Sequence, residues 1–244
     1  SIGEFSAATL AGVFQFDDAI GLVARRGSLM QSMPAGKMLV VNSGADQVLE
    51  YLGNQVSLAA VNAPKLTVLS GEELTIQKVE QQLSRKKIPT MSLRTSHAFH
   101  SHMMEPVVSE FESAVAALSR GHLKIPVYST KTGKLLQNKE AASPAYWASQ
   151  LRSTVMFSEA LTGITQEHTD CNIAFLEVGP GKTLATLVSY HPHLKNAVVI
   201  PALPGGGAKE LTQAELAECV NKLWVKGYPI KWQDTYRSLK VRKT

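Results

Sequence analysis

The chain has 244 residues, of which 44% are hydrophobic and 18% are charged, and its formal net charge is +5. This composition suits one globular domain with a sizeable core, and it argues against a membrane protein because no apolar run approaches the length of a membrane span. The basic residues gather at 85–87 and 240–243 without the aromatic or glycine spacing of nucleic-acid-binding motifs, so we expect solvated surfaces there and no nucleic-acid partner.

The first part of the chain, residues 3–31, is predicted to be helical. Residues 3–31 begin with many small residues and then carry apolar residues at helical spacing, with Asp17 and Asp18 placed to favour a helix start. Pro34 and Gly36 break this pattern.

Residues 37–95 change to a pattern of short strands and two helices. The predicted order is βαββαβ, with strands at 37–43, 56–62, 66–70 and 88–95 and helices at 45–53 and 72–87. This is the order of a ferredoxin-like module. It is complete in itself, so we expect a small subdomain at 37–95.

From residue 96 onward helices alternate with short apolar strands. Strands are predicted at 125–130, 173–178 and 197–203, and helices at 104–118, 143–151, 157–164, 182–190 and 214–227. Such alternation predicts a parallel, layered α/β sheet. We therefore expect an α/β fold in which a hydrolase-like catalytic subdomain, residues 1–36 and 96–203, contains the ferredoxin-like insertion. Residues 204–244 are predicted to be a glycine-rich loop at 205–207, a last helix and an outgoing linker.

Two motifs suggest ligands that we do not expect. Gly179-Pro-Gly-Lys-Thr183 looks like a phosphate loop, but the position where a Walker motif needs its first glycine is Leu176, so we interpret it as a tight strand-to-helix turn. His97, His100 and His102 have spacings that suit metal coordination, but neither an HExxH pattern nor a cysteine pair supports a metal site. One catalytic histidine with two neighbours that shape its pocket is the preferred alternative.

The chain begins with Ser1-Ile2-Gly3-Glu4, the second half of the Gly-x-Ser-x-Gly turn that presents a nucleophilic serine. Gly3 allows a tight turn, and a following helix would direct its amide donors at the serine oxygen. Arg26 follows at the end of the amphipathic helix. From the residues alone, Arg26 is equally well a surface arginine or a buried guanidinium that grips a carboxylate.

Read together, several ordered blocks resemble the malonyl/acyl-transferase family, which includes the acyltransferase domains of modular polyketide and animal fatty acid synthases and the free-standing malonyl-CoA:acyl carrier protein transacylases. The resemblance covers the whole chain. Its blocks are SIGEFSAATLAG, DDAIGLVARRGSLMQ, VSLAAVNAPKLTVLSG, TSHAFHSHMMEP, AYWASQLRSTVMFSEAL, FLEVGPGKTL and LWVKGYPIKW.

The resemblance implies a ping-pong acyl transfer. Ser1 would attack the thioester carbonyl of malonyl-CoA with His100 as general base, and the backbone amide of Ile2 would contribute to the oxyanion hole. Arg26 would hold the malonyl carboxylate, and an oxygen of Gln150 would orient His100. The phosphopantetheine thiol of an acyl carrier protein would then accept the malonyl group. The family implies no bound cofactor and no metal, and it implies a neighbouring ketosynthase and other synthase domains.

Two further positions are matched by the resemblance. Asn62 matches an asparagine close to the family's substrate cleft, although it suits a turn before Pro64 equally well. Phe99 lies in His-Ala-Phe-His, the version that goes with malonyl extender units in polyketide acyltransferases. Its bulk would fill the space of an α-methyl group, which is worth only about 1–3 kcal/mol, so Phe99 would bias the choice without fixing it.

The sequence departs from the family pattern at its start. The Gly-His that comes before the serine in the family, and the family's first strand, are absent from this sequence. We expect a fragment of a longer synthase that is poorly active by itself. A non-catalytic scaffold beside a ketosynthase and a hydrolase that releases malonate to water are the alternatives. Cys171 and Cys219 form neither a disulfide framework nor a metal-ligand spacing, which favours a reducing, cytoplasmic setting.

Overall fold

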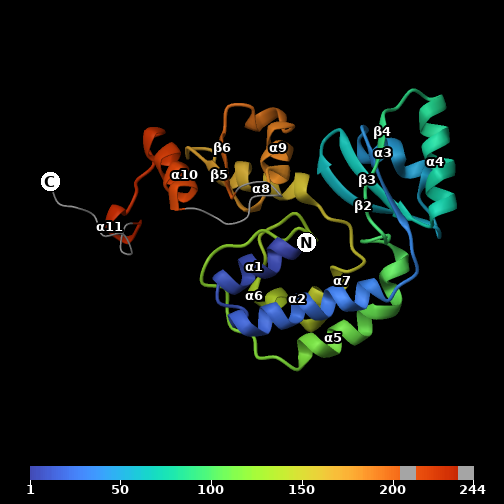
Figure 1. Cartoon of the computed structure of the whole chain (residues 1–244), viewed down its shortest axis with the longest axis horizontal. Coiled ribbons are helices and arrows are strands. Elements are labelled where there is room, and N and C mark those ends of the chain that lie inside the picture. The colour runs from blue at the N-terminus through green and yellow to red at the C-terminus, as the bar shows by residue number, and fades with distance from the viewer. Residues whose placement is uncertain (204–212, 236–244) are drawn as a thin grey trace. The chain divides into compact units, whose positions relative to one another are not determined.

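The computed structural model describes residues 1–203 and 213–235, and it divides into two compact units at Thr169 and Asp170. The first unit combines a helical layer with a four-stranded sheet, and the second contains a two-stranded parallel sheet (Figure 1). The chain is thus of the α/β class, as predicted.

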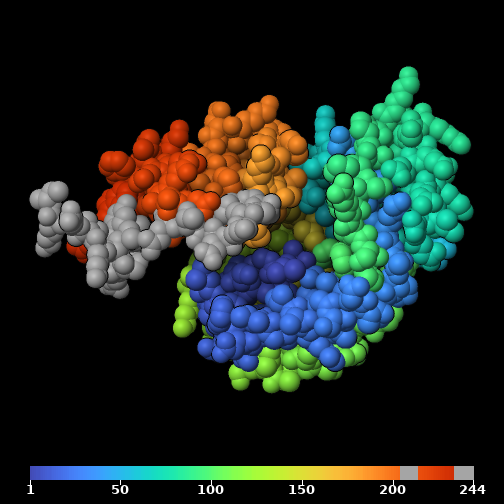
Figure 2. Space-filling view, viewed as in Figure 1, coloured from blue at the N-terminus to red at the C-terminus, as the bar shows by residue number. Residues whose placement is uncertain are grey.

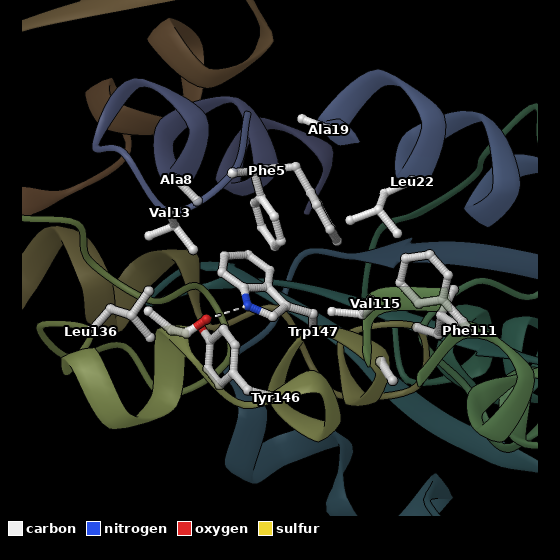
Figure 3. Packing of buried hydrophobic residues seen from close by; sticks show 14 of the residues in the cluster. Phe5, Ala8, Val13, Ala19, Leu22, Phe111, Val115, Leu136, Tyr146 and Trp147 are labelled. Carbon is white, nitrogen blue, oxygen red and sulfur yellow. Dashed lines mark hydrogen bonds between the residues drawn. The ribbon is translucent and has the colours of Figure 1, made fainter. Parts of the chain in front are cut away.

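The helical layer of the first unit is built around one aromatic core (Figure 3). Phe5 is fully buried, and its ring centroid lies 5.0 Å from that of Trp147, which is itself fully buried. The helices of this layer are α1 (Ile2–Leu10), α2 (Phe16–Gln31), α5 (Val108–Ala116), α6 (Asn138–Ala141) and α7 (Pro144–Ser149). Gly12, with φ of 91°, makes the left-handed turn that separates α1 from α2.

The helix α2 shows why the periodicity of its sequence was informative. Its buried side chains recur every three or four residues and are Ala19, Leu22, Arg26, Leu29 and Met30. Arg26 therefore belongs to the buried face. The N-terminal helices are shown in blue in Figure 2. Their exposed apolar side chains include Leu10, Phe16 and Ile20.

Residues 37–92 form the predicted βαββαβ module. Its elements are β1 (Lys37–Val41), α3 (Ala45–Val48), the 3-10 helix η1 (Leu49–Tyr51), β2 (Val56–Ala63), β3 (Leu66–Gly71), α4 (Glu73–Arg85) and β4 (Thr90–Ser92). All pairings in this sheet are antiparallel, in the order β2-β3-β1-β4. This topology is ferredoxin-like.

The two faces of this sheet have different partners because successive side chains of a strand point to opposite sides. Leu39 and Val41 pack with residues of α3 and α4. Met38 and Val40 lie on the other face, where Phe99 and Val155 cover them. The second face therefore connects the module to residues near the predicted histidine motif.

The edge strand β2 is extended by a segment from a distant part of the sequence. The N–H of Val61 donates to the carbonyl oxygen of Val155 at 2.8 Å, and the N–H of Val155 donates to that of Ala59 at 2.9 Å. The helix α8 (Phe157–Glu167) follows this segment. These bonds satisfy backbone groups that an edge strand otherwise leaves exposed.

One predicted strand of the first unit is wrong. Residues 125–130 form an irregular loop, with a single antiparallel bridge between Tyr128 and Leu135. The loop closes on itself through the turn at Gly133, whose φ is 68°. A strand needs a neighbour along its length, and within the described part of the first unit this segment has only that bridge. The strands described in the first unit are accordingly antiparallel, and the predicted parallel sheet is not found there.

The second unit contains the parallel arrangement that the sequence predicted. The strands β5 (Ala174–Pro180) and β6 (Val198–Leu203) are parallel. They are connected through α9 (Thr183–Ser189) and the 3-10 helix η3 (Pro192–Leu194), and α10 (Gln213–Val225) and α11 (Trp232–Thr235) follow. The motif at 179–183 thus lies at a strand-to-helix turn, as interpreted. The predicted glycine loop at 205–207 and the end of the predicted linker lie outside the described residues.

The contacts within the chain group residues 170–203 with the C-terminal helices, whereas the sequence grouped them with the catalytic subdomain. The predicted domain boundaries stay a prediction. No helix among residues 1–203 and 213–235 combines the length and the apolar character that crossing a membrane requires.

The aromatic core of the first unit gives a test of the fold. Replacing the fully buried Trp147 with alanine should lower the free energy of unfolding by about 3–5 kcal/mol, because a cavity opens beside Phe5 and Phe14. Urea denaturation followed by circular dichroism measures this change. Phe16→Ala is the matched control, because Phe16 is 69% exposed and its loss should cost no more than about 0.5 kcal/mol. Equal effects of the two substitutions would contradict the packing.

Candidate active site

Three side chains that are distant in the sequence meet at one oxygen atom. The Ser1 Oγ lies 3.1 Å from the His100 Nε2. The Arg26 Nη2 donates a hydrogen bond to the same oxygen at 2.9 Å. The structure therefore brings together the predicted nucleophile, the predicted base and the predicted carboxylate-binding residue.

Ser1 is positioned by the first turn of α1, for which it is the N-cap residue. The N–H of Glu4 donates to the carbonyl oxygen of Ser1 at 3.2 Å, which closes this turn. The first N–H groups of a helix have no acceptor within the helix, so those of Ile2 and Gly3 are available beside Ser1. The Ile2 side chain itself is half exposed. This arrangement suits the predicted role of the Ile2 amide.

Arg26 is only 3% exposed, whereas the neighbouring Arg25 points outward and pairs with Glu110. Burial lowers the pKa of Arg26 to about 10, which leaves the guanidinium charged at neutral pH. Its Nε has no hydrogen-bond acceptor among the described residues. A buried cation with a spare donor is suited to receive a carboxylate through two hydrogen bonds.

His100 is held by two backbone contacts with the segment that follows α7. Its N–H donates to the carbonyl oxygen of Leu151 at 3.2 Å, and its Nδ1 lies 3.0 Å from the carbonyl oxygen of Ser153. Because a carbonyl oxygen only accepts, Nδ1 carries the proton and the lone pair of Nε2 faces the hydroxyl of Ser1. This is the tautomer that a general base requires.

The backbone and the electrostatics of His100 are both unusual. Its φ is 57°, in the left-handed region that residues other than glycine seldom adopt. Burial is the main cause that lowers the pKa of His100 to about 4, and the positive charge of Arg26 acts in the same direction. The imidazole is therefore neutral at pH 7. Strained backbone and shifted pKa values both cluster at functional sites.

The residue predicted to orient His100 was Gln150. Gln150 is buried at the C-cap of α7, and its backbone interacts with His100. The carbonyl oxygen of Ser153 also does so, 3.0 Å from the His100 Nδ1. The sequence missed Ser153 because any residue can supply a backbone carbonyl oxygen. No property of its side chain marks it.

A pocket with an empty volume of about 150 Å³ opens beside the reacting atoms. Its lining residues are Ser1, His100, Thr130, Lys131, Gln150, Ser153, Thr154 and Val155. Lys131, which the sequence analysis did not single out, adds a second cation to this site, and its Nζ donates to the Ser149 Oγ at 2.7 Å.

Phe99 and Asn62 lie outside this pocket lining. Phe99 is half-buried, packs between the helical core and the module, and stacks on His97 with ring centroids 6.0 Å apart. Asn62 lies within β2, and the turn falls at Pro64 and Lys65, so the interpretation of Asn62 as a turn residue is wrong. Their roles in substrate selection stay predictions.

The three clustered histidines have separate environments. His97 contacts the Ser96 Oγ at 2.7 Å, His100 faces Ser1, and His102 begins the 3-10 helix η2 (His102–Val107). In the part of the chain that the structure describes, no group of three or more histidine, cysteine or acidic side chains is arranged to hold a metal ion.

The chain is similar to known proteins along most of its length. Residues 1–221 match the model of the acyl transferase domain family. The spectinabilin polyketide synthase system protein NorB of Streptomyces orinoci is 35% identical over 240 residues, which are 95% of this chain and 11% of that protein. The phenolphthiocerol synthesis polyketide synthase Pks15/1 of Mycobacterium marinum is 35% identical over 234 residues, with the same coverage of both chains. This chain thus spans about a tenth of the length of these two relatives.

Two solved structures show the same fold. The acyltransferase domain from the second module of the salinomycin polyketide synthase has a TM-score of 0.86 and 30% identity, over 99% of this chain and 57% of that one. The malonyl CoA-acyl carrier protein transacylase of Clostridium perfringens has a TM-score of 0.79 and 26% identity, over 92% of this chain and 69% of that one. The family match covers most of the chain, so the chain belongs to the acyl transferase domain family.

Proposed function

We propose that this chain transfers a malonyl group from malonyl-CoA, through an ester on Ser1, to the phosphopantetheine thiol of an acyl carrier protein. The observation that carries the proposal is the convergence of a serine hydroxyl, a neutral imidazole and a buried guanidinium on one oxygen atom. The membership of the chain in the acyl transferase domain family supports it. So does its similarity to a malonyl CoA-acyl carrier protein transacylase.

In the first half-reaction the Ser1 Oγ attacks the thioester carbonyl while the His100 Nε2 takes the hydroxyl proton. The tetrahedral oxyanion is stabilised by backbone N–H groups, with the Ile2 amide as one donor. When the intermediate collapses, the C–S bond breaks and His100 returns its proton to the leaving thiolate of CoA. The products are the malonyl ester of Ser1 and free CoA.

In the second half-reaction the thiol of the carrier protein follows the same course in reverse. His100 takes the thiol proton, the sulfur attacks the ester carbonyl, and the proton returns to the Ser1 Oγ as the C–O bond breaks. No step requires a bound cofactor or metal ion. The proton returns to its starting position after each full cycle.

Arg26 supplies the preference for a dicarboxylic acyl group. Its guanidinium is already desolvated, so an acyl group without a carboxylate leaves a buried cation without a partner, which is unfavourable. Phe99, in the motif that contains His100, would bias the choice toward malonyl over methylmalonyl units. Asn62 and Gln150 are proposed to line or support the substrate cleft.

The proposed setting is a multidomain synthase in the cytoplasm, with a ketosynthase and other synthase domains as neighbours. Both polyketide synthase relatives are much longer than this chain, which supports that setting. Within the chain we propose a catalytic subdomain at 1–36 and 96–203, a small subdomain at 37–95 and a C-terminal helix and linker at 204–244. A non-catalytic scaffold module is the alternative.

The central test uses mass spectrometry on the longest natural polypeptide that contains this sequence. Incubation with equal malonyl-CoA and methylmalonyl-CoA should add a malonyl group to Ser1, and the labelled enzyme should pass it to a carrier-protein thiol faster than to water. The Ser1→Ala variant should take no label. A protein with intact fold and no label on Ser1 would support the scaffold alternative, and discharge to water alone would support a hydrolase.

The role of Arg26 predicts a change in substrate choice. Arg26→Leu should lower kcat/KM for malonyl-CoA by about 100-fold, because hydrogen bonds between charged groups are worth about 1.5–3 kcal/mol each. The rate with acetyl-CoA should fall much less. Arg25→Leu is the matched control, since Arg25 is on the exposed side of α2 and should change neither rate. Equal losses with both thioesters would contradict carboxylate binding by Arg26.

The lowered pKa of His100 predicts the pH dependence of Ser1 acylation. The base is active only when neutral, so the single-turnover rate should stay level from about pH 8 to about pH 5 and fall at lower pH, with an apparent pKa of about 4. Rapid-quench mass spectrometry after brief exposure to each pH measures this profile. The His100→Ala variant should be slow at every pH. A midpoint near the ordinary histidine value of about 6.5 would contradict the assignment.

A further inference from the structure

A buried carboxylate lies one helical turn from Ser1 and takes no part in the proposed chemistry. Glu4 is 5% exposed in the first turn of α1. It accepts hydrogen bonds from the Thr130 N–H at 2.9 Å, from the Thr130 Oγ1 at 2.5 Å and from the hydroxyl of Tyr146. Burying a carboxylate costs free energy, and the three hydrogen bonds offset that cost. A fully hydrogen-bonded buried group also fixes the relative positions of its partners.

Tyr146 is the donor that reaches Glu4 from another helix. It lies in α7, where its ring makes an edge contact with Trp147 at 5.1 Å between centroids, and its hydroxyl contacts the Ser129 Oγ at 2.5 Å. Burial and the neighbouring Glu4 raise the pKa of Tyr146, so the hydroxyl keeps its proton and remains a donor. The Glu4–Tyr146 contact is thus a direct polar link between α1 and α7.

The segment that follows the C-terminal end of α7 contacts His100. The carbonyl oxygens of Leu151 and Ser153, which hold the N–H and the Nδ1 of His100, follow directly after α7. These contacts form a closed circuit. It runs from Ser1 along α1 to Glu4, across to Tyr146, along α7 to His100 and back to Ser1. The Glu4–Tyr146 bond lies opposite the Ser1–His100 contact in this circuit.

We propose that Tyr146 is a positioning residue, whose hydrogen bond to Glu4 sets the separation between the Ser1 Oγ and the His100 Nε2. This inference rests on the proposed function, because it takes Ser1 and His100 as the reacting pair. The packing of Phe5 on Trp147 also connects α1 with α7, but apolar contacts are not directional and fix the relative position less sharply than a hydrogen bond. Tyr146 is not among the residues that line the pocket beside Ser1 and His100.

The test removes one oxygen atom at each of two Tyr–Glu pairs. Tyr146→Phe deletes the link to Glu4 and keeps the ring that packs on Trp147. Tyr128→Phe is the matched control, because the hydroxyl of Tyr128 donates to the Glu167 Oε2 at 2.5 Å at an exposed position. Both variants are made in the longest natural polypeptide that contains this sequence.

The readout is the rate constant for phosphonylation of Ser1 by a small alkyl fluorophosphonate. This probe has no carboxylate, so its reaction reports the activation of Ser1 without the binding of a carboxylate by Arg26. The rate constant is compared at a temperature where circular dichroism shows that each variant is fully folded, so that a loss of stability alone does not change it. Tyr146→Phe should react about 10- to 100-fold more slowly, because a misplacement of about 1 Å costs up to about 100-fold. Tyr128→Phe should match the wild type.

Steady-state kinetics and a double variant separate positioning from a general structural role. Tyr146→Phe should lower kcat for malonyl transfer and leave KM within about twofold, because Arg26 is untouched. Glu4→Ala removes the acceptor of the Tyr146 hydroxyl and should be slower than the wild type. Adding Tyr146→Phe to Glu4→Ala should lower the rate constant by less than it does in the wild-type background, because the interaction that it deletes is already lost.

The outcomes distinguish this inference from the proposed function. A Tyr146→Phe rate within about twofold of the wild type, with Ser1→Ala unreactive, would overturn the positioning role and leave the proposed function standing. An equal loss in Tyr128→Phe, or additive losses in the double variant, would also overturn it. Labelling of the Ser1→Ala variant at the wild-type rate would instead overturn the assignment of the nucleophile. If the Tyr146→Phe variant did not fold, the test would rest on Glu4→Ala, and an unchanged rate constant in that variant would overturn the link.

Discussion

The pairing of Val155 with the edge of β2 is the constraint on which the arrangement of the first unit depends. It joins the segment after α7 to the ferredoxin-like sheet through two backbone hydrogen bonds. The same segment presents the carbonyl oxygen of Ser153 to His100 two residues earlier. The backbone hydrogen bonds of a sheet are short and directional. The hydrogen bonds at the edge of β2 therefore fix the position of the segment that holds the imidazole. The module is thereby part of the site although none of its own side chains reacts.

Arg26 couples substrate recognition with the state of the base. Its charge stands at the serine oxygen to receive an anion, and it also disfavours a second positive charge on His100. Burial acts on the imidazole in the same direction. The result is a base that stays available across the neutral range but has a modest affinity for the proton it must hold during the reaction. A bound carboxylate would offset part of the charge of Arg26 and so strengthen the base when substrate is present.

Much of this arrangement was accessible from the sequence. The periodic burial of α2 separates Arg26, which continues the row of Leu22, Leu29 and Met30, from Arg25, which does not. That row was visible in the sequence and would have decided between the two interpretations of Arg26. The alternation of apolar residues likewise gave the order of the ferredoxin-like module, because each strand has one face on the helices and one on the rest of the unit.

Other features depend on partners that a linear pattern does not reveal. Residues 125–130 have the composition of a strand, but a strand exists only where another backbone completes its ladder, and here the segment turns back on itself at Gly133. The acceptor role of Ser153 comes from its backbone, and the link between Glu4 and Tyr146 joins residues 142 positions apart. Such contacts arise from the tertiary fold, so the local secondary-structure propensity of the sequence does not predict them.

The left-handed backbone of His100 has a consequence for how this position can change over time. A histidine with φ of 57° holds a conformation that glycine or asparagine adopts more readily, at a local cost of about 1 kcal/mol or more. Selection for folding alone would therefore favour residues that adopt this backbone conformation at a lower free-energy cost. The position would keep its imidazole only in lineages where the chemistry continues to matter. The histidine at this turn is thus better explained by its chemistry than by its contribution to folding.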